Sequence, residues 1–179
     1  MSAVGGVVGQ RQAGRSRLFV GLVLILILAG GTAVLQAVSG IPTAYGNAQF
    51  GSASALAAED SFPPLTDLAE GAEADLNRFI PGYTLLGAVA LLVAFVLRGR
   101  RHDDIPLLTK ICLLLAVGVA ADVIETVLFR STVTSLIDGT DPTELADQVL
   151  FTRVAFVAKF AGLLAALAGL VLLVARRAD

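Results

Sequence analysis

The chain has 179 residues, of which 56% are hydrophobic and 16% charged, with a formal net charge of −2 and a mean hydropathy of +0.81. A soluble domain of this size needs far more polar surface, and here the apolar residues are gathered in long blocks. The balanced charge, with no stripe of Lys and Arg, argues against a nucleic-acid-binding protein, and a single cysteine, Cys112, excludes an internal disulfide.

Four apolar blocks are long enough to cross a bilayer at about 1.5 Å of rise per residue. The first block is longer than the roughly 7–15 apolar residues of a signal peptide, so we expect a retained span and keep a cleaved signal peptide as the alternative. The second begins at Pro81, and proline is tolerated in the first turn of a helix. The blocks cover residues 18–38, 81–98, 105–129 and 149–175. The sequence therefore predicts an all-α membrane protein with a bundle of four transmembrane helices.

Arginine marks one end of this predicted bundle. Arginines precede the first span, join the second and third spans in RGRR (98–101), and close the chain in RR (176–177). The two larger connections, 39–80 and 130–148, are mainly acidic. The positive-inside rule then places both termini in the cytoplasm and both larger loops outside. Because the chain is rich in Ala, Gly and Arg and poor in Lys, we expect a bacterial plasma membrane.

We expect a cytoplasmic tail at 1–17 and a single membrane domain over 18–179. Within the first outer connection, residues 39–64 are rich in Gly, Ala and Ser and predict a flexible loop. Residues 65–79 follow a helical period, with acids on the face opposite the apolar side chains. The apolar face comprises Leu65, Leu68, Ala72, Leu76 and Phe79, and the polar face Asp67, Glu70, Glu73 and Asn77. We expect a short amphipathic helix outside the membrane, roofing the bundle, with a docking surface for a protein partner as the alternative.

The second outer connection carries a helix-start signal. Asp141 suits an N-cap position, Pro142 the first helical position, and Glu144 the third, as in a capping box. We therefore expect the fourth helix to begin near Pro142, before it enters the lipid.

Two acids in the third span and two bases in the fourth are the most specific feature of the sequence: Asp122, Glu125, Arg153 and Lys159. An unpaired charge near mid-membrane costs roughly 2.5–3.5 kcal/mol, so such residues need partners. In an antiparallel hairpin, Asp122 lies at the depth of Lys159, and Glu125 at the depth of Arg153. Arg153 is rotated by about 120° from Lys159 around the helix, so its partner is less certain. We expect Asp122 to pair with Lys159, and Arg153 to reach Glu125, the membrane surface or another group.

These charges have two main readings. The first is structural: the pairs join the third and fourth spans and set their register. The functional alternative is a polar site for a proton, an ion or a zwitterionic ligand. Pairing with another subunit is a third possibility.

Small residues predict where helices approach closely in the membrane. Gly118 shares a face with Asp122 on the third span, and the fourth span carries two ridges of small residues. The ridges are Ala158, Gly162 and Ala166, and Ala161, Ala165 and Gly169. Two ridges predict close neighbours on more than one side of the fourth span.

The sequence contains no nucleophile–base set, no zinc-helix motif and no phosphate loop, so we name no catalytic residue, metal site or cofactor. The leading hypothesis is a non-catalytic accessory or assembly subunit of a larger bacterial membrane complex. Its expected partners are the lipid bilayer and other proteins of that complex, and no nucleic acid. The alternatives are a small transporter or channel component that uses the four intramembrane charges, or a membrane anchor for a soluble domain.

Overall fold

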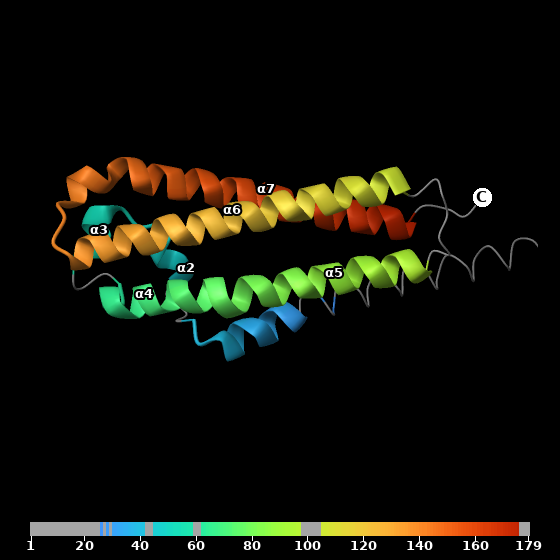
Figure 1. The fold of residues 1–179 in the computed structure, drawn as a ribbon, viewed down its shortest axis with the longest axis horizontal. Helices are drawn as coiled ribbons and strands as arrows, with labels where there is room; N and C mark the ends of the chain where they lie inside the picture. The colour runs from blue at the N-terminus through green and yellow to red at the C-terminus, as the bar shows by residue number, and fades with distance from the viewer. Residues whose placement is uncertain are drawn as a thin grey trace, which may run out of the picture.

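The computed structural model describes residues 26, 28, 30–41, 45–58, 62–97 and 105–175, and every regular element within them is helical. Residues 30–39 form part of a first helix. The elements that follow are α2 (Tyr45–Ala48), α3 (Ala53–Ala57), α4 (Leu65–Ala74), the π-helical turn η1 (Asp75–Phe79), α5 (Ile80–Leu97), α6 (Ile105–Ile137), the 3₁₀ turn η3 (Pro142–Leu145) and α7 (Ala146–Ala175). In Figure 1, α6 and α7 lie side by side and α4 and α5 run along them as one rod.

Three of the described helices are long and apolar enough to cross a membrane: Leu65–Val96, Ile105–Ile137 and Pro142–Leu173. By this length and hydropathy the chain is a multi-pass integral membrane protein. Residues 18–25, 27 and 29 of the predicted first span, 18–38, and the whole predicted tail, 1–17, fall outside the described residues. The described part of that span is helical and packs on α5, where Leu35 lies against Gly82.

The expected separate helix over 65–79 is instead continuous with the next span. Helix α4 passes through η1 into α5 without a break, and Pro81 lies in the first turn of α5. A proline lacks the N–H of a regular helix and crowds the preceding turn. The π-helical turn just before it, closed by the Ile80 N–H to the Asp75 carbonyl, widens the backbone where that crowding falls. The polar face of α4 is therefore an extension of a membrane helix, not a separate roof.

Helices α6 and α7 form an antiparallel hairpin that is longer than the predicted spans of 105–129 and 149–175. The reversal uses Gly139 at φ +84°, a backbone conformation that glycine adopts without strain. Asp141 caps the return segment, as expected, by accepting a bond from the Thr143 N–H at 2.8 Å. Deeper in the hairpin, a Cβ added to Gly162 would lie 2.9 Å from the Gly118 Cα, so the two backbones touch there.

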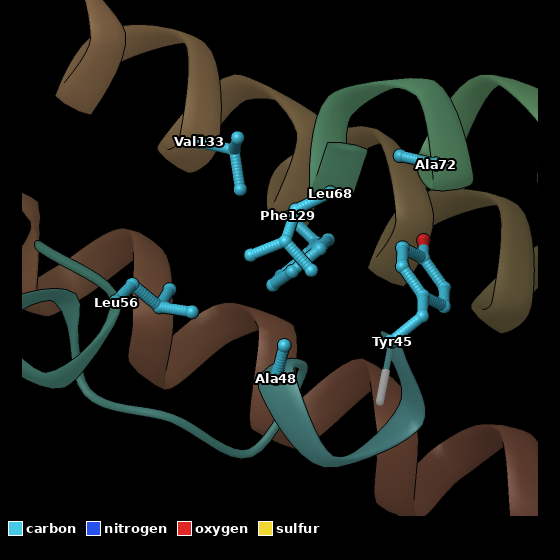
Figure 2. Packing of buried hydrophobic residues seen from close by; sticks show 7 residues of the cluster. All are labelled: Tyr45, Ala48, Leu56, Leu68, Ala72, Phe129 and Val133. Atoms are coloured by element: carbon cyan, nitrogen blue, oxygen red, sulfur yellow. The ribbon is translucent and has the colours of Figure 1, made fainter. Parts of the chain in front are cut away.

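Two apolar clusters lie at different levels of the bundle. The far cluster lies among the C-terminal halves of α5 and α7 and the N-terminal part of α6. It comprises Ala90, Ala94, Ile111, Ala166, Leu170 and Leu173. The α2-side cluster comprises Tyr45, Ala48, Leu56, Leu68, Ala72, Phe129 and Val133. Figure 2 shows the side chains that α2 and α3 contribute on one side of this cluster and those of α4 and α6 on the other. Along α6, the stretch between the two clusters contains Asp122 and Glu125.

Candidate functional site

Polar side chains from five parts of the chain meet between the two apolar clusters. We call them the polar layer. Helix α6 supplies three of them, and the rod of η1 and α5, helix α7 and the α2 segment supply the rest. The members are Tyr45, Gln49, Asp75, Tyr83, Asp122, Glu125, Thr126 and Lys159.

The Lys159 ammonium joins both acids of α6. Its Nζ lies 2.9 Å from Asp122 Oδ1 and 2.7 Å from Glu125 Oε2. The side chain of Lys159 is 13% exposed, that of Asp122 4%, and that of Glu125 0%. The rings of Phe156 and Phe160, with centroids 5.2 and 5.5 Å from Nζ, add two cation–π contacts. A buried cation held by two carboxylates and two rings cannot leave without large rearrangement.

The remaining hydrogen bonds extend the layer to α5 and η1. The Tyr83 hydroxyl on α5 donates to Asp122 Oδ2, so both oxygens of that carboxylate are bonded. On the other side, Thr126 Oγ1 donates to Asp75 Oδ2 at 2.9 Å, and both residues are buried. The layer therefore ties the rod to the hairpin through directional bonds.

The charges of the layer do not balance. Three buried carboxylates, Asp75, Asp122 and Glu125, share one ammonium, so full ionisation leaves three negative charges against one positive. Burying an uncompensated charge costs several kcal/mol. Among the described residues, no group of three or more His, Cys, Asp or Glu side chains is arranged to hold a metal ion. A proton is the smallest species that reduces this excess of two negative charges, because it can bind a single carboxylate.

Some buried polar atoms of the layer make no hydrogen bond of ordinary geometry within the described part of the chain. They are the Tyr45 hydroxyl, the Gln49 Nε2 and, beyond its ion pair with Lys159, the carboxylate of Glu125. Burial, and next the charges of Asp75 and Glu125, raise the pKa of Tyr45 well above its usual range. The phenol therefore stays protonated and available as a donor. The layer therefore contains two donors, the Tyr45 hydroxyl and the Gln49 Nε2, near one acceptor, the Glu125 carboxylate.

The structure pairs Asp122 with Lys159, as the helical geometry predicted. It also brings Glu125 to Lys159 and leaves Arg153 apart from the other three charges. Asp122 meets Lys159, and Glu125 meets the same lysine. Arg153 does not reach Glu125; it is exposed, and its Nη2 donates to the Phe50 carbonyl at 3.1 Å. The physical reason is its rotation around α7, which turns it toward the α2–α3 segment. Glu125 compensates by sharing Lys159.

The small residues of α7 divide in a similar way. Gly162 contacts Gly118, Gly169 contacts the Ile111 side chain, and Ala166 is buried in the far cluster. By contrast, Ala158 and Ala161 are exposed and Ala165 is half-buried. The expectation of two packed ridges is therefore wrong for these described positions: one stripe faces α6, and the other side of α7 remains open.

Sequence reasoning missed Asp75 and Tyr83. Asp75 lies in the acidic connection 39–80 that the sequence places outside the membrane, yet it is only 5% exposed. A signal was present in the helical period: Asp75 follows Ala72 by three residues and precedes Phe79 by four, and Tyr83 follows Phe79 by four. Once α4, η1 and α5 are one rod, these residues share the face turned toward α6.

A solvent-facing groove of about 600 Å³ lies beside this rod. It runs between the turn at Ser39 and Gly40 and the polar face of α4 and η1. Arg78 bridges its two walls by donating to the Ser39 carbonyl at 3.3 Å. Glu73 on its rim pairs with Arg130 at 3.4 Å, and both of those side chains are about half exposed. Such exposed pairs contribute little to stability, so the groove has the character of a solvated surface.

Comparison with known proteins adds no family. No protein-family model matches the chain, and neither a curated protein nor a solved structure matches it. Arguments about function therefore rest on the polar layer and the helices around it.

Proposed function

We propose that the chain is a small non-catalytic transporter or channel component whose polar layer takes up and releases a proton. The supporting observation is the charge imbalance of three buried carboxylates around one ammonium. A static link between α6 and α7 needs only one acid for Lys159. Each further buried acid adds a desolvation cost without adding a cation. Ionisable groups inside a membrane persist at such cost chiefly where they form ion or proton pathways.

We place the transport hypothesis ahead of the accessory-subunit hypothesis because Asp75 is a third buried acid beside Asp122 and Glu125. With Asp122, Glu125 and Lys159 alone, the layer holds one excess negative charge, which two α6 acids could share around a single lysine. With Asp75 the excess is two, and a bound proton stabilises the layer whichever carboxylate holds it.

The experiment is proton flux into vesicles that contain the purified full chain. A potassium gradient with valinomycin sets the membrane potential, and a dye inside the vesicles reports acidification. We expect uptake above that of protein-free vesicles, and Asp122→Asn and Glu125→Gln each to lower the initial rate roughly tenfold. Asp147→Asn, an exposed acid of α7, is the matched control. Uptake equal to that of empty vesicles overturns the proposal.

The accessory-subunit hypothesis keeps support from a different observation. The helices present wide apolar faces that the described chain leaves uncovered, including Leu85, Leu92 and Val96 on α5 and Leu150, Val154 and Val157 on α7. Lipid can cover such faces, and so can neighbouring subunits. The mass and composition of the particle extracted from its native membrane in mild detergent separate the two. Other proteins in fixed ratio favour an accessory subunit, whereas a particle of this chain alone favours transport.

A further inference from the structure

We infer that Glu125 is the proton-binding carboxylate of the polar layer, and that Tyr45 and Gln49 form its water-mediated access route from the α2 end. This inference rests on the proposed function for its purpose, but its own observations are the unbonded polar atoms of the layer. These atoms indicate the side from which the proton reaches Glu125 and the two residues along its path, which the charge count alone does not.

Glu125 is the acid with the most unused bonding capacity. Its side chain is 0% exposed, yet beyond Lys159 it makes no hydrogen bond to the described residues. Asp122, in contrast, is bonded at both oxygens by Lys159 and Tyr83, and Asp75 accepts from Thr126. An acid that is already bonded by donors favours its charged form, whereas a poorly bonded buried acid favours its neutral form. Lys159 contacts Glu125 at Oε2 alone, and Glu125 Oε1 is buried without a donor, which holds for no oxygen of Asp75 or Asp122 among the described residues. We therefore place the proton on Glu125 Oε1.

Tyr45 lies near this acid, and Gln49 lies beside Tyr45. The Tyr45 ring packs edge-on against Phe129, which lies one helical turn beyond Glu125 on α6, with ring centroids 5.3 Å apart. Gln49 follows Tyr45 by one turn, since its N–H bonds the Tyr45 carbonyl at 3.2 Å. The Tyr45 hydroxyl and the Gln49 Nε2 make no hydrogen bond of ordinary geometry among the described residues, although Gln49 and Thr126 both lie beside the hydroxyl. The hydroxyl is both a donor and an acceptor, and Nε2 is a donor. A buried water usually makes two to four hydrogen bonds to such groups, so water suits this position.

The charged and titratable groups around Glu125 come from every element packed on it. They are Tyr45 from α2, Asp75 from η1, Tyr83 from α5, Asp122 from α6 and Lys159 from α7.

The two ends of the layer differ in their access to solvent. Toward the α2 end, Phe50, which follows the buried Gln49, is exposed, and so is Asn47, two residues before Gln49. Toward the opposite end, Gly118 lies one turn from Asp122 and touches Gly162 backbone to backbone, so no water fits between α6 and α7 there. The far cluster then fills the space among α5, α6 and α7. Exchange with solvent is therefore one-sided, at the end that the arginine distribution places outside.

The test is infrared difference spectroscopy of the full chain in lipid nanodiscs, with D₂O as the probe. The carbonyl stretch of a protonated carboxyl group appears on acidification, and its loss in Glu125→Gln assigns it. Mixing with D₂O shifts that stretch at the rate at which the site exchanges with solvent. We expect Tyr45→Phe to slow this exchange about tenfold, the size of losing one hydrogen-bonding relay group, and Gln49→Ala to slow it less. Asn47→Ala, an exposed amide on the same short helix, is the matched control with an unchanged rate.

The outcomes separate this inference from the proposed function. If Glu125→Gln leaves the stretch in place, the proton is on another acid and the inference is wrong. Equal exchange rates in wild type, Tyr45→Phe and Gln49→Ala overturn the route, because the two changes act on different residues and need not both disturb folding. Exchange that depends on Tyr45 in a chain that passes no protons across vesicles leaves the inference standing and overturns the transport role.

Discussion

The polar layer and the far cluster join the same helices by opposite means. In the far cluster, α5, α6 and α7 meet through small and apolar residues such as Ala94, Ile111 and Ala166. In the polar layer, the same helices meet through ion pairs and hydrogen bonds around Lys159. Lipid is as apolar as leucine, so the far cluster gains from close packing alone and tolerates small sliding of one helix on another. The polar layer tolerates neither sliding nor rotation.

This difference explains where specificity and cost lie in the bundle. A helix rotated by one residue still offers apolar contacts at the far cluster, but it leaves a carboxylate without a donor in the layer. Burying ions in a low-dielectric region is expensive unless their partners are in place. The polar layer thus fixes the register of the helices at the cost of an internal charge imbalance. The far cluster supplies contact area between the helices without fixing their register.

The substitution with the largest expected effect on stability is Lys159→Ala in the polar layer. It leaves Asp122 and Glu125 buried without their cation, and we expect the free energy of unfolding to fall by about 3–5 kcal/mol at neutral pH. The loss should shrink as the pH is lowered, because protonated carboxyl groups need no cation. Unfolding in mixed micelles, followed by circular dichroism, measures both effects.

The other lysine of the chain provides the control. Lys110 lies exposed on α6, and Lys110→Ala should change the free energy of unfolding little. Equal effects of the two substitutions would mean that Lys159 contributes no more than a surface charge.

The contrast also shows what sequence reasoning could reach. Hydropathy was enough for the described membrane helices, and the depth match within a hairpin placed Asp122 beside Lys159, because helical rise and period are local properties. The partner of Arg153 could not be chosen among the expected alternatives, because depth does not set rotation around the helix axis. Asp75 failed because its burial depends on α4 joining α5 as one rod. Tyr45 lies in a Gly- and Ala-rich segment without a period, so only tertiary packing places it in the layer.

At the boundary between the two regions, Gly162→Ala should be the next largest change. The added methyl would lie 2.9 Å from the Gly118 Cα and 3.0 Å from the Leu114 carbonyl oxygen, both backbone atoms that cannot rotate away. We expect a loss of about 1–3 kcal/mol in the free energy of unfolding as α6 and α7 separate. The same micelle assay measures it.

Two other glycines calibrate that result. Gly169→Ala meets only side-chain atoms of Ile111 in the far cluster, the nearest being Cγ1 at 2.7 Å. A side chain can shift where a backbone atom cannot, so the loss should be smaller. Gly30→Ala meets nothing within 4 Å and should be close to neutral. If Gly169→Ala costs more than Gly162→Ala, the closest approach of the hairpin lies in the far cluster.

A narrower test removes one hydrogen bond of the layer. Thr126→Val keeps the volume but leaves the Asp75 carboxylate without its donor, and we expect a loss of about 1–3 kcal/mol. Thr132→Val on the same helix is the control: Thr132 is equally buried, but its hydroxyl bonds only the Leu128 carbonyl of its own helix. Similar losses from both would indicate that burial of any threonine on α6 matters, and not the link to η1.

Tyr45→Phe should have the smallest effect on stability at neutral pH, at most about 1 kcal/mol, because the hydroxyl makes no hydrogen bond of ordinary geometry to Thr126 or Gln49, the residues beside it. The variant separates from wild type under alkaline conditions. Burial, and next the charges of Asp75 and Glu125, raise the pKa of Tyr45 above its unfolded value near pH 10. A raised folded pKa means that the stabilising contribution is complete below the unfolded pKa and is lost as the pH rises above it. Wild type should therefore lose stability above about pH 10 more steeply than Tyr45→Phe. Parallel curves would place the Tyr45 ring in a solvated position and remove it from the layer.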